Sequence, residues 1–216
     1  MPPPNPAWRA LGAGGGRPAN PRAFPEPFRR RRPLVTTLNT SDTLTPDSRL
    51  PLADGTLAVL VGIPGCGKST FAGKYPASWR VCLDEYRLAA TDDMADQSAT
   101  PVAAQIQNLI LDARLARGRT TLVDSTNVFA HVRAGLLARA RYWQRPTAAV
   151  LFDVPLATAQ AQNATRERIV PSHVLHDLHA QMPTADQLHT EGFTAVYLAS
   201  ELAHQLLGVP DDDGRR

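Results

Sequence analysis

The stretch LAVLVGIPGCGKST, residues 57–70, decides the fold. Its first five residues form a short continuous apolar run, which is typical of a strand buried on both faces of a sheet. The next eight residues match the pattern G-x-x-x-x-G-K-[ST] and follow the run directly. Glycines in this pattern let the backbone wrap around phosphates with its N–H groups pointing inward. The sequence therefore predicts a phosphate-binding loop between a strand and a helix.

The residues of this loop have distinct expected roles toward ATP and Mg²⁺. Lys68 is expected to reach the β- and γ-phosphates, and the Ser69 hydroxyl is expected to ligate Mg²⁺. Only two of the 23 Lys and Arg residues are lysines, and Lys68 is one of them. Cys66 is either a redox-sensitive thiol or simply a small residue that fits the turn. The other loop residues expected to contact ATP are Gly62, Gly65, Cys66, Gly67 and Thr70.

Apolar runs and helix-length stretches alternate along the chain after Gly55. Further apolar runs, predicted to be strands, lie at 80–83, 120–123, 148–154 and 194–198. The stretches predicted to form helices are 101–117, 129–143, 155–165 and 171–181. Gly118 and Pro171 stand where helices commonly stop and start. Alternating strands and helices indicate an α/β fold built on a parallel sheet with right-handed crossovers.

The first 54 residues differ in composition from the rest. They hold 11 of the 19 prolines and the cluster Arg29–Arg32, which either steers the protein to phosphates or is merely solvated. Such a segment buries too little apolar surface to offset the entropy of ordering, so 1–54 is predicted to be a disordered tail. The folded domain is expected over 55–208, with a flexible acidic end at 209–216. Residues 55–216 carry a net charge of −1, so the overall charge of +3 comes from the tail.

Composition excludes several classes of protein. Hydrophobic residues make up 43% of the chain and charged residues 20%, as in globular proteins. No apolar run approaches the ~20 residues that span a bilayer, and the N-terminus lacks the apolar segment of a secretory signal. Two cysteines cannot build a disulfide framework. We therefore expect a cytoplasmic protein with no membrane association and no protein partner evident in its sequence.

Acidic residues follow two of the predicted strands, at the edge where chemistry gathers in parallel sheets. Asp84 is either a general base that accepts a proton from an attacking hydroxyl or a helix N-cap. Arg87, three residues on, lies near Asp84 if a helical turn starts there. Asp124 either contacts Mg²⁺ through water or caps the next helix.

Three further groups of polar residues each allow a functional and a structural interpretation. The segment Arg166-Glu167-Arg168 either places an Arg over the transferring phosphate or is a charged loop between helices. The spacing of His173, His176 and His179 drifts around a helix, which disfavours a metal site. Asp211–Gly214 loosely matches a D-x-D-G phosphatase motif, but no strand precedes it, so it is predicted to be a frayed end.

Several of these pieces occur in an order that resembles a known family. They are GIPGCGKST at 62–70, DEYR at 84–87, VDSTN at 123–127, FDVP at 152–155 and NATRERIVPSHVL at 163–175. Over about residues 56–182 the chain resembles the kinase domain of phage and bacterial polynucleotide 5′-hydroxyl kinases, which are P-loop ATP-binding proteins of the AAA family. The resemblance implies a three-layer P-loop kinase fold of the adenylate-kinase kind, with a five-stranded parallel sheet.

The resemblance also implies a role for each matching residue. Asp84 matches the family's general base, and Arg87 matches the Arg that holds the acceptor's phosphate. Arg166 matches the lid Arg that contacts the donor's phosphates. Lys68 and Ser69 keep the roles given above.

The chain departs from the family in the lid. Gln162 stands where the family's lid can carry another Arg, and one residue is missing between Arg166 and Pro171. The grip on the donor or the preference for an acceptor is therefore expected to differ.

Together, the sequence predicts an ATP-dependent, Mg²⁺-requiring kinase that phosphorylates a hydroxyl. Lys68, Asp84 and Arg166 are its expected catalytic residues. A nucleic-acid 5′-hydroxyl is the leading acceptor, and a nucleoside, sugar or antibiotic is the alternative. A second hypothesis is a regulatory ATP-binding module with slow hydrolysis.

Overall fold

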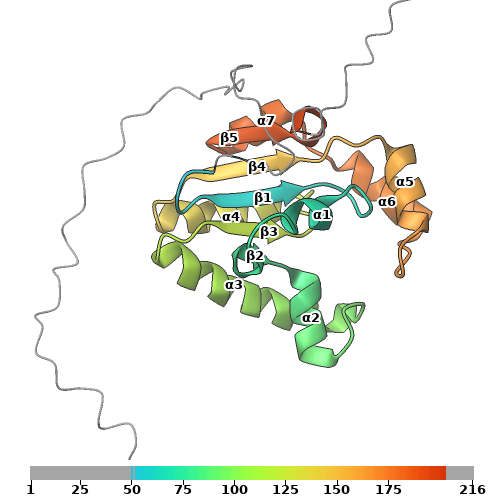
Figure 1. Cartoon of the computed structure of the whole chain (residues 1–216), viewed down its shortest axis with the longest axis horizontal. Helices are drawn as coiled ribbons and strands as arrows, with labels where there is room; N and C mark the ends of the chain where they lie inside the picture. Colours follow the sequence, from blue (N-terminus) through green and yellow to red (C-terminus); the bar gives the residue numbers. More distant parts are fainter. Residues whose placement is uncertain (1–49, 51, 203–216) are drawn as a thin grey trace, which may run out of the picture. The chain divides into compact units, whose positions relative to one another are not determined.

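A parallel sheet forms the centre of the computed structural model, which describes residues 50 and 52–202 (Figure 1). The sheet has five strands in the order β2-β3-β1-β4-β5. The strands are β1 (Leu57–Val61), β2 (Arg80–Val81), β3 (Thr121–Asp124), β4 (Thr147–Leu151) and β5 (Ala195–Leu198). All neighbouring strands run parallel. The predicted α/β fold with a five-stranded parallel sheet is therefore confirmed.

Helices join the strands and cover both faces of the sheet (Figure 1). The α-helices are α1 (Lys68–Ala72), α2 (Leu83–Thr91), α3 (Thr100–Ala116), α4 (Ala130–Tyr142), α5 (Leu156–Ala164), α6 (Ser172–Ala180) and α7 (Ala185–Glu191). Two short 3₁₀ turns, η2 (Ala77–Trp79) and η3 (Gln97–Ala99), precede β2 and α3. Each predicted helix lies within about one residue of its expected bounds at either end.

Strand β1 supplies side chains to two separate cores. Leu57, Val59 and Val61 pack with buried residues of α3 and α4 on one face of the sheet. Ala58 and Leu60 point to the other face and pack with buried residues of α1 and α5. All side chains of β1 are buried, which explains why the strand is a continuous apolar run instead of an alternating one. The fold thus has the predicted three layers.

The loops after β1 and β3 meet at the carboxyl edge of the sheet. The Gly62 N–H donates to the Thr126 carbonyl at 3.0 Å. The buried Asn127 side chain donates to the Leu60 carbonyl at 2.8 Å. The chain leaves β1 toward β2 at one edge of the sheet and leaves β3 toward β4 on the other side. The place between two neighbouring strands with opposite connections is where ligands bind in open parallel sheets.

Two strand predictions differ from the structure. The run at 80–83 forms a strand only over Arg80–Val81, because Cys82 is the N-cap of α2 and Leu83 already belongs to the helix. Asp84 consequently lies in the first turn of α2, so the alternative that Asp84 is the helix N-cap is wrong. The run at 148–154 ends as a strand at Leu151, and Pro155 then caps α5.

The two ends of the chain lie largely outside the described residues. This holds for most of the predicted tail 1–54, for the acidic end 209–216 and for Asp211–Gly214. Leu50 is described: its side chain is buried, and its N–H donates to the Tyr75 hydroxyl at 2.9 Å. Within residues 50–202, apart from 51, no helix combines the length and apolarity needed to cross a membrane.

Candidate active site

A cavity of about 810 Å³ lies at the carboxyl edge of the sheet. It is lined by the phosphate-binding loop, the start of α2, the loop after β3 and the segment between α5 and α6. The sequence-predicted site residues that line it are Gly65, Gly67, Lys68, Ser69, Thr70, Asp84, Arg87, Asp124 and Arg166. Gly62 and Cys66 do not line the cavity. The structure therefore brings most of the predicted site residues together around one space.

Two glycines give the phosphate-binding loop its shape. Gly65 and Gly67 have φ angles of 86° and 93°, in the left-handed region that favours glycine. A Cβ at Gly65 would also lie 2.5 Å from the Ala159 carbonyl oxygen of α5, too close for any other residue. The loop is thus packed directly against the helix that precedes the Arg-bearing segment.

Lys68 lies buried inside the loop. Its ammonium donates to the Ile63 carbonyl at 2.7 Å and contacts the Cys66 sulfur at 3.5 Å. None of the ion pairs among the described residues involves Lys68. Its positive charge is therefore balanced by no carboxylate and remains available to an anion in the cavity.

Cys66 belongs to the phosphate-binding loop, and its side chain is buried. Burial raises the pKa of the Cys66 thiol, although the nearby Lys68 ammonium opposes this effect. Burial likewise raises the pKa of Cys82 at the start of α2. A raised pKa leaves less thiolate at a given pH, and the thiolate is the reactive form. The structure thus favours Cys66 as a small residue that fits the turn.

We expect the native protein to resist thiol alkylation. With iodoacetamide at about pH 7.5, where thiol reactivity follows the thiolate fraction, both cysteines should react far more slowly than in the urea-unfolded chain. Mass spectrometry of peptides containing Cys66 and Cys82 measures the two rates. Equal rates in the native and unfolded chains would show that Cys66 is a reactive thiol after all.

Asp84 and Arg87 form an ion pair on one face of α2, as their spacing predicted. The Arg87 side chain is only 7% exposed, whereas that of Asp84 is 48% exposed. Arg87 also donates from Nε to the Met94 carbonyl at 2.9 Å. Arg87 is therefore fixed, and it holds a carboxylate that remains accessible from the cavity.

Asp124 is buried at the end of β3 beside Arg80 of β2. Arg80 Nε donates to its carboxylate at 2.8 Å, and Arg80 Nη1 contacts Glu85 at 2.7 Å. Burial alone would lower the pKa of Arg80, but the negative charges of Asp124 and Glu85 outweigh it and raise that pKa. Phe129 occupies the N-cap of α4, so the alternative that Asp124 caps the next helix is wrong.

Three oxygen-bearing side chains of the cavity wall are candidate ligands of a magnesium ion. Ser125 lines the same cavity, and its buried hydroxyl oxygen has no hydrogen-bond partner in the described part of the chain. Ser69 and Asp124 bring a second hydroxyl and a carboxylate to that cavity. Hydroxyl, carboxylate and water oxygens are the ligands that Mg²⁺ prefers.

The segment between α5 and α6 is closed into a loop by one buried side chain. Asn163 donates from Nδ2 to the Val170 carbonyl at 2.9 Å, and its Oδ1 accepts from the Val170 N–H at 3.1 Å. Arg166 and Arg168 lie within this loop, and both line the cavity. The loop closes against the phosphate-binding loop, because Asn163 lies directly beside Gly65. Gln162, where the family can carry an Arg, lines the same cavity.

Sequence reasoning assigned no individual role to Arg80, Ser125, Asn163 or Arg168. Arg80 was visible only as the first residue of the apolar run 80–83, and Arg168 only as a member of the charged segment 166–168; their partners are distant in sequence. The position of Ser125 directly after Asp124 was a usable signal for a polar residue at the strand edge.

The three histidines of α6 face outward. His173, His176 and His179 are exposed, and His176 contacts the Gln160 side chain at 3.1 Å. Within residues 50–202, apart from 51, no group of three or more His, Cys, Asp or Glu side chains is placed to hold a metal ion.

A second cavity of about 240 Å³ lies beside the phosphate-binding loop, at the end of β4. Its lining includes Ile63, Phe152, Val154, Met182 and Pro183. Most of these side chains are apolar, so this space suits an uncharged group better than a phosphate.

A phosphate-binding loop after the first strand of this parallel sheet defines the class: a nucleotide-binding P-loop fold of the kinase kind. Residues 57–185 match a protein-family model described as an AAA domain, and this range is more than half of the chain. The chain therefore belongs to that P-loop family, as its sequence motifs predicted. A search of curated protein sequences finds no match.

Several solved structures are similar to this chain at low sequence identity. One chain of the Pnkp1/Rnl/Hen1 RNA repair complex is 21% identical, with a TM-score of 0.54 over 66% of this chain and 47% of that one. The match thus spans less than half of the length of that chain. Kti12 of Chaetomium thermophilum is 14% identical, with a TM-score of 0.46 over 66% of this chain and 87% of that one. A gluconokinase of Sinorhizobium meliloti 1021 is 16% identical, with a TM-score of 0.45 over 73% and 92%.

Proposed function

We propose that this protein is an ATP-dependent kinase that transfers the γ-phosphate of ATP to a hydroxyl group. One observation carries the proposal: the accessible carboxylate of Asp84 and the uncompensated ammonium of Lys68 line the same cavity. A phosphoryl donor held by the loop and a hydroxyl held near Asp84 would share that space. P-loop kinases need this arrangement, because their catalysis is mostly positioning and charge stabilisation.

The side chains divide the reaction between them. Asp84 accepts the proton of the attacking hydroxyl while the oxygen of that hydroxyl forms a bond to the γ-phosphorus. The bond between that phosphorus and the bridging oxygen breaks, and ADP leaves with the electron pair. Lys68 and Arg166 stabilise the negative charge on the phosphoryl group in flight. Arg87 holds a phosphate of the acceptor.

Ser69, Asp124 and Ser125 are the residues that would hold Mg²⁺, with Asp124 contacting it through water. A bound Mg²⁺ would neutralise charge on the phosphates of the donor. Arg80 keeps the Asp124 carboxylate in place at the edge of the sheet.

A nucleic-acid 5′-hydroxyl is the acceptor favoured by the order of the five motifs and by the Asp84–Arg87 pair. The fold shared with a chain of an RNA repair complex is compatible with it. A small hydroxyl-bearing molecule is the second candidate, and one observation favours it: residues 55–216 carry a net charge of −1. A long polynucleotide usually meets a basic surface.

Transfer of γ-labelled phosphate tests the proposal. We expect ATP with Mg²⁺ to label a 5′-hydroxyl DNA or RNA oligonucleotide, and the Lys68→Ala variant to label it far more slowly. Oligonucleotides that already carry a 5′-phosphate serve as the matched acceptor control and should remain unlabelled.

Three other outcomes would change the proposal. Label found only in a pool of nucleosides and sugars would keep the kinase reaction and replace the acceptor. Label on oligonucleotides with a 5′-phosphate would show that the phosphoryl group goes elsewhere. ATP binding without transfer to any acceptor would favour a regulatory ATP-binding module.

A further inference from the structure

We propose that the edge of the sheet opposite the candidate active site binds a single strand of nucleic acid. Five arginines at the ends of α3 and α4 contact its phosphates, and one exposed tyrosine stacks on a base. The five, which we call the arginine patch, are Arg114, Arg117, Arg119, Arg141 and Arg145. The choice of nucleic acid as the partner rests in part on the proposed function, whereas the surface itself does not.

The arginine patch lies where two turns come close together. Arg119 precedes β3 by two residues, and Arg145 precedes β4 by two residues. The first residues of these strands, Thr121 and Thr147, pair with Leu57 from its two sides. Neighbouring strands are ~4.8 Å apart, so the two turns are about 10 Å apart. Figure 1 shows both turns at the sheet edge opposite the loop that joins β1 to α1.

Side-chain contacts make the patch continuous. Arg145 reaches back from the turn before β4 and donates from Nε to the Leu115 carbonyl of α3 at 2.7 Å. Its guanidinium also lies against Gly118, since a Cβ there would be 3.2 Å from Arg145 Nη1. Gly118 has Arg117 and Arg119 as its chain neighbours. Two separate turns therefore bring their arginines to one place.

No acidic side chain neutralises the patch. None of its five arginines takes part in the ion pairs among the described residues. Residues 112–145 contain two acidic side chains, and both are already paired. Asp112 is paired with Arg139, and Asp124 is paired with Arg80. The positive charges of the patch are therefore available to an anion.

Hydrogen bonds to the backbone fix some of these guanidinium groups without balancing their charge. Arg114 donates from Nη2 to the Thr120 carbonyl at 2.7 Å, and Arg117 donates from Nη1 to the Ala113 carbonyl at 2.7 Å. A carbonyl accepts hydrogen bonds but carries no net charge. Burial, and after it the positive charge of Arg119, lower the pKa of Arg114. The two guanidinium groups therefore repel each other, and a bound phosphate would relieve the repulsion.

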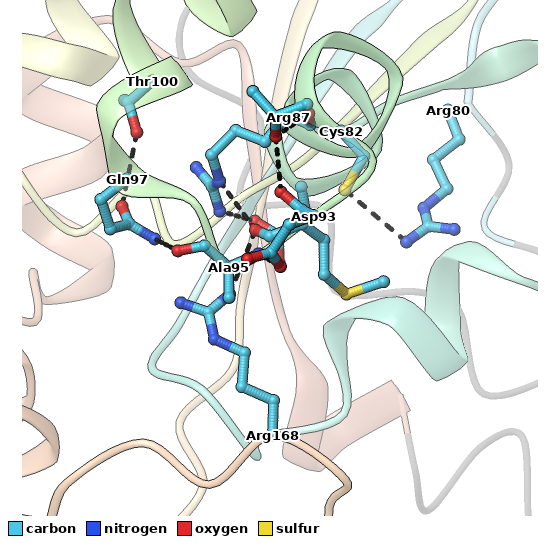
Figure 2. A network of polar contacts seen from close by, with 11 residues as sticks. Arg80, Cys82, Arg87, Asp93, Ala95, Gln97, Thr100 and Arg168 are labelled. Atoms are coloured by element: carbon cyan, nitrogen blue, oxygen red, sulfur yellow. Dashed lines mark hydrogen bonds and ion pairs between the residues drawn. The ribbon is translucent and has the colours of Figure 1, made fainter.

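Charge is unevenly distributed over the chain. Residues 112–145 carry seven arginines and two aspartates, a net charge of +5, whereas residues 55–216 as a whole carry −1. The arginines around the cavity differ from those of the patch. Arg87 is paired with Asp84, and Figure 2 shows Arg87 and Arg168 directed toward the acidic segment after α2. The low net charge thus conceals a basic face, and such a face is what a polynucleotide requires.

An exposed aromatic side chain stands at the end of α4. Tyr142 is 77% exposed and directly follows Arg141. Its ring packs at a right angle against that of Trp143, with the ring centroids 4.9 Å apart. Trp143 is held in turn, because its Nε1 donates to Asp112 at 3.1 Å. Positive charges beside an exposed aromatic ring are the combination by which proteins hold single strands without reading their sequence. This combination favours a nucleic-acid strand over an anionic membrane, which needs only the charges.

Helix α3 connects the cavity to the patch. Gln97, at the start of η3, lines the cavity, and Arg117 follows the last residue of α3. The 17 residues of this helix span about 25 Å at ~1.5 Å per residue. A strand with its 5′ end in the cavity therefore reaches the patch only after several nucleotides. The affinity for a nucleic-acid acceptor should consequently grow with its length.

Fluorescence anisotropy tests the surface without any phosphoryl transfer. A single-stranded DNA of about 20 nucleotides, with a 5′-hydroxyl and a 3′-fluorescein, is titrated with the full chain in the absence of ATP. The triple variant carries Arg117→Gln, Arg119→Gln and Arg141→Gln, which remove three exposed charges. We expect its Kd to be about 100-fold higher than that of the wild type at about 0.1 M salt, since each lost phosphate contact weakens binding roughly fivefold there. The slope of log K against log salt should become shallower by about 2.

Control variants separate charge, position and stacking. Lysine at the same three positions keeps the charges, so it should preserve most of the binding. Lys74→Gln removes an exposed charge after α1 and should change Kd less than about twofold, whereas Arg119→Gln alone should raise it roughly fivefold. Tyr142→Ala should weaken binding roughly 5- to 100-fold with an unchanged salt slope, because stacking releases no counterions. Thermal unfolding of each variant shows that the fold is intact.

Phosphorylation of long and short acceptors distinguishes this inference from the proposed function. The wild type should have a lower KM for the long strand than for a dinucleotide, and the triple variant should raise KM only for the long strand. If both acceptors are phosphorylated and the triple variant behaves like the wild type, the proposed function stands and the inference is wrong. If the strand binds through the patch but no nucleic acid is phosphorylated, the inference stands and the proposed acceptor is wrong.

Two binding results would overturn the inference directly. One is an equal Kd of the wild type and the triple variant for the strand. The other is binding of the wild type to vesicles of phosphatidylcholine and phosphatidylserine with no binding to the strand, which would make the patch a membrane surface instead.

Discussion

Lys68→Ala is expected to lower the rate of phosphoryl transfer by about 10²–10³-fold and to weaken ATP binding as well. The Lys68 ammonium is the buried cation of the phosphate-binding loop, and no carboxylate of the described residues neutralises it. It now donates to the Ile63 carbonyl at 2.7 Å, an uncharged partner that a phosphate oxygen can replace. The variant should therefore lose charge stabilisation both in the bound state and in the transition state.

The chain offers a matched control for this variant. Lys74 is its only other lysine, lies exposed after α1 and does not line the cavity. Lys74→Ala should retain both ATP binding and transfer. Lys68→Met keeps most of the apolar stem, so it separates loss of charge from loss of packing. If Lys68→Ala bound ATP and transferred phosphate like the wild type, the loop would not hold the donor.

The sequence predicted best those features that depend on residues close together in the chain. The apolar run 57–61 and the glycine-rich loop after it predicted a buried strand and its turn, because both sides of β1 are covered by helices. The pairing of Asp84 with Arg87 also followed from their spacing on one helix. The same reasoning could not exclude Asp84 as a helix cap. The structure excludes it, because Cys82 occupies the N-cap of α2 and β2 ends one residue earlier, at Val81.

Features that join distant segments could not be predicted in this way. Arg80 and Asp124 are 44 residues apart, and they meet because β2 and β3 are neighbours in the sheet. Arg168 and Met94 are 74 residues apart, and only the folded chain brings the loop after α5 to the segment after α2. Arg80 and Arg168 alone look like ordinary charged residues in the sequence. Strand order and loop closure give them their partners, and no local pattern encodes either.

Asp84→Asn is expected to lower the rate of transfer by about 10²–10⁴-fold while ATP still binds. The Asp84 side chain is 48% exposed and lines the cavity, so its carboxylate can reach an incoming hydroxyl. An amide of the same shape can still accept a hydrogen bond from Arg87, but it cannot take up a proton. The loss should therefore fall on kcat, and the affinity for ATP should stay close to that of the wild type.

A lower kcat with an unchanged affinity for ATP distinguishes the role of Asp84 from that of Lys68 and from that of a merely structural residue. Asp186→Asn, on the exposed first turn of α7, makes the same chemical change away from the cavity and should leave kcat unchanged. A loss of ATP binding in Asp84→Asn would mean that the variant disturbs the loop instead of the proton transfer. Transfer at the wild-type rate would show that another group accepts the proton. A variant that binds ATP, unfolds at the wild-type temperature and fails to transfer phosphate has lost only the proton transfer. This outcome is expected because, in the proposed mechanism, the loop holds the donor and Asp84 removes the proton from the other side of the cavity.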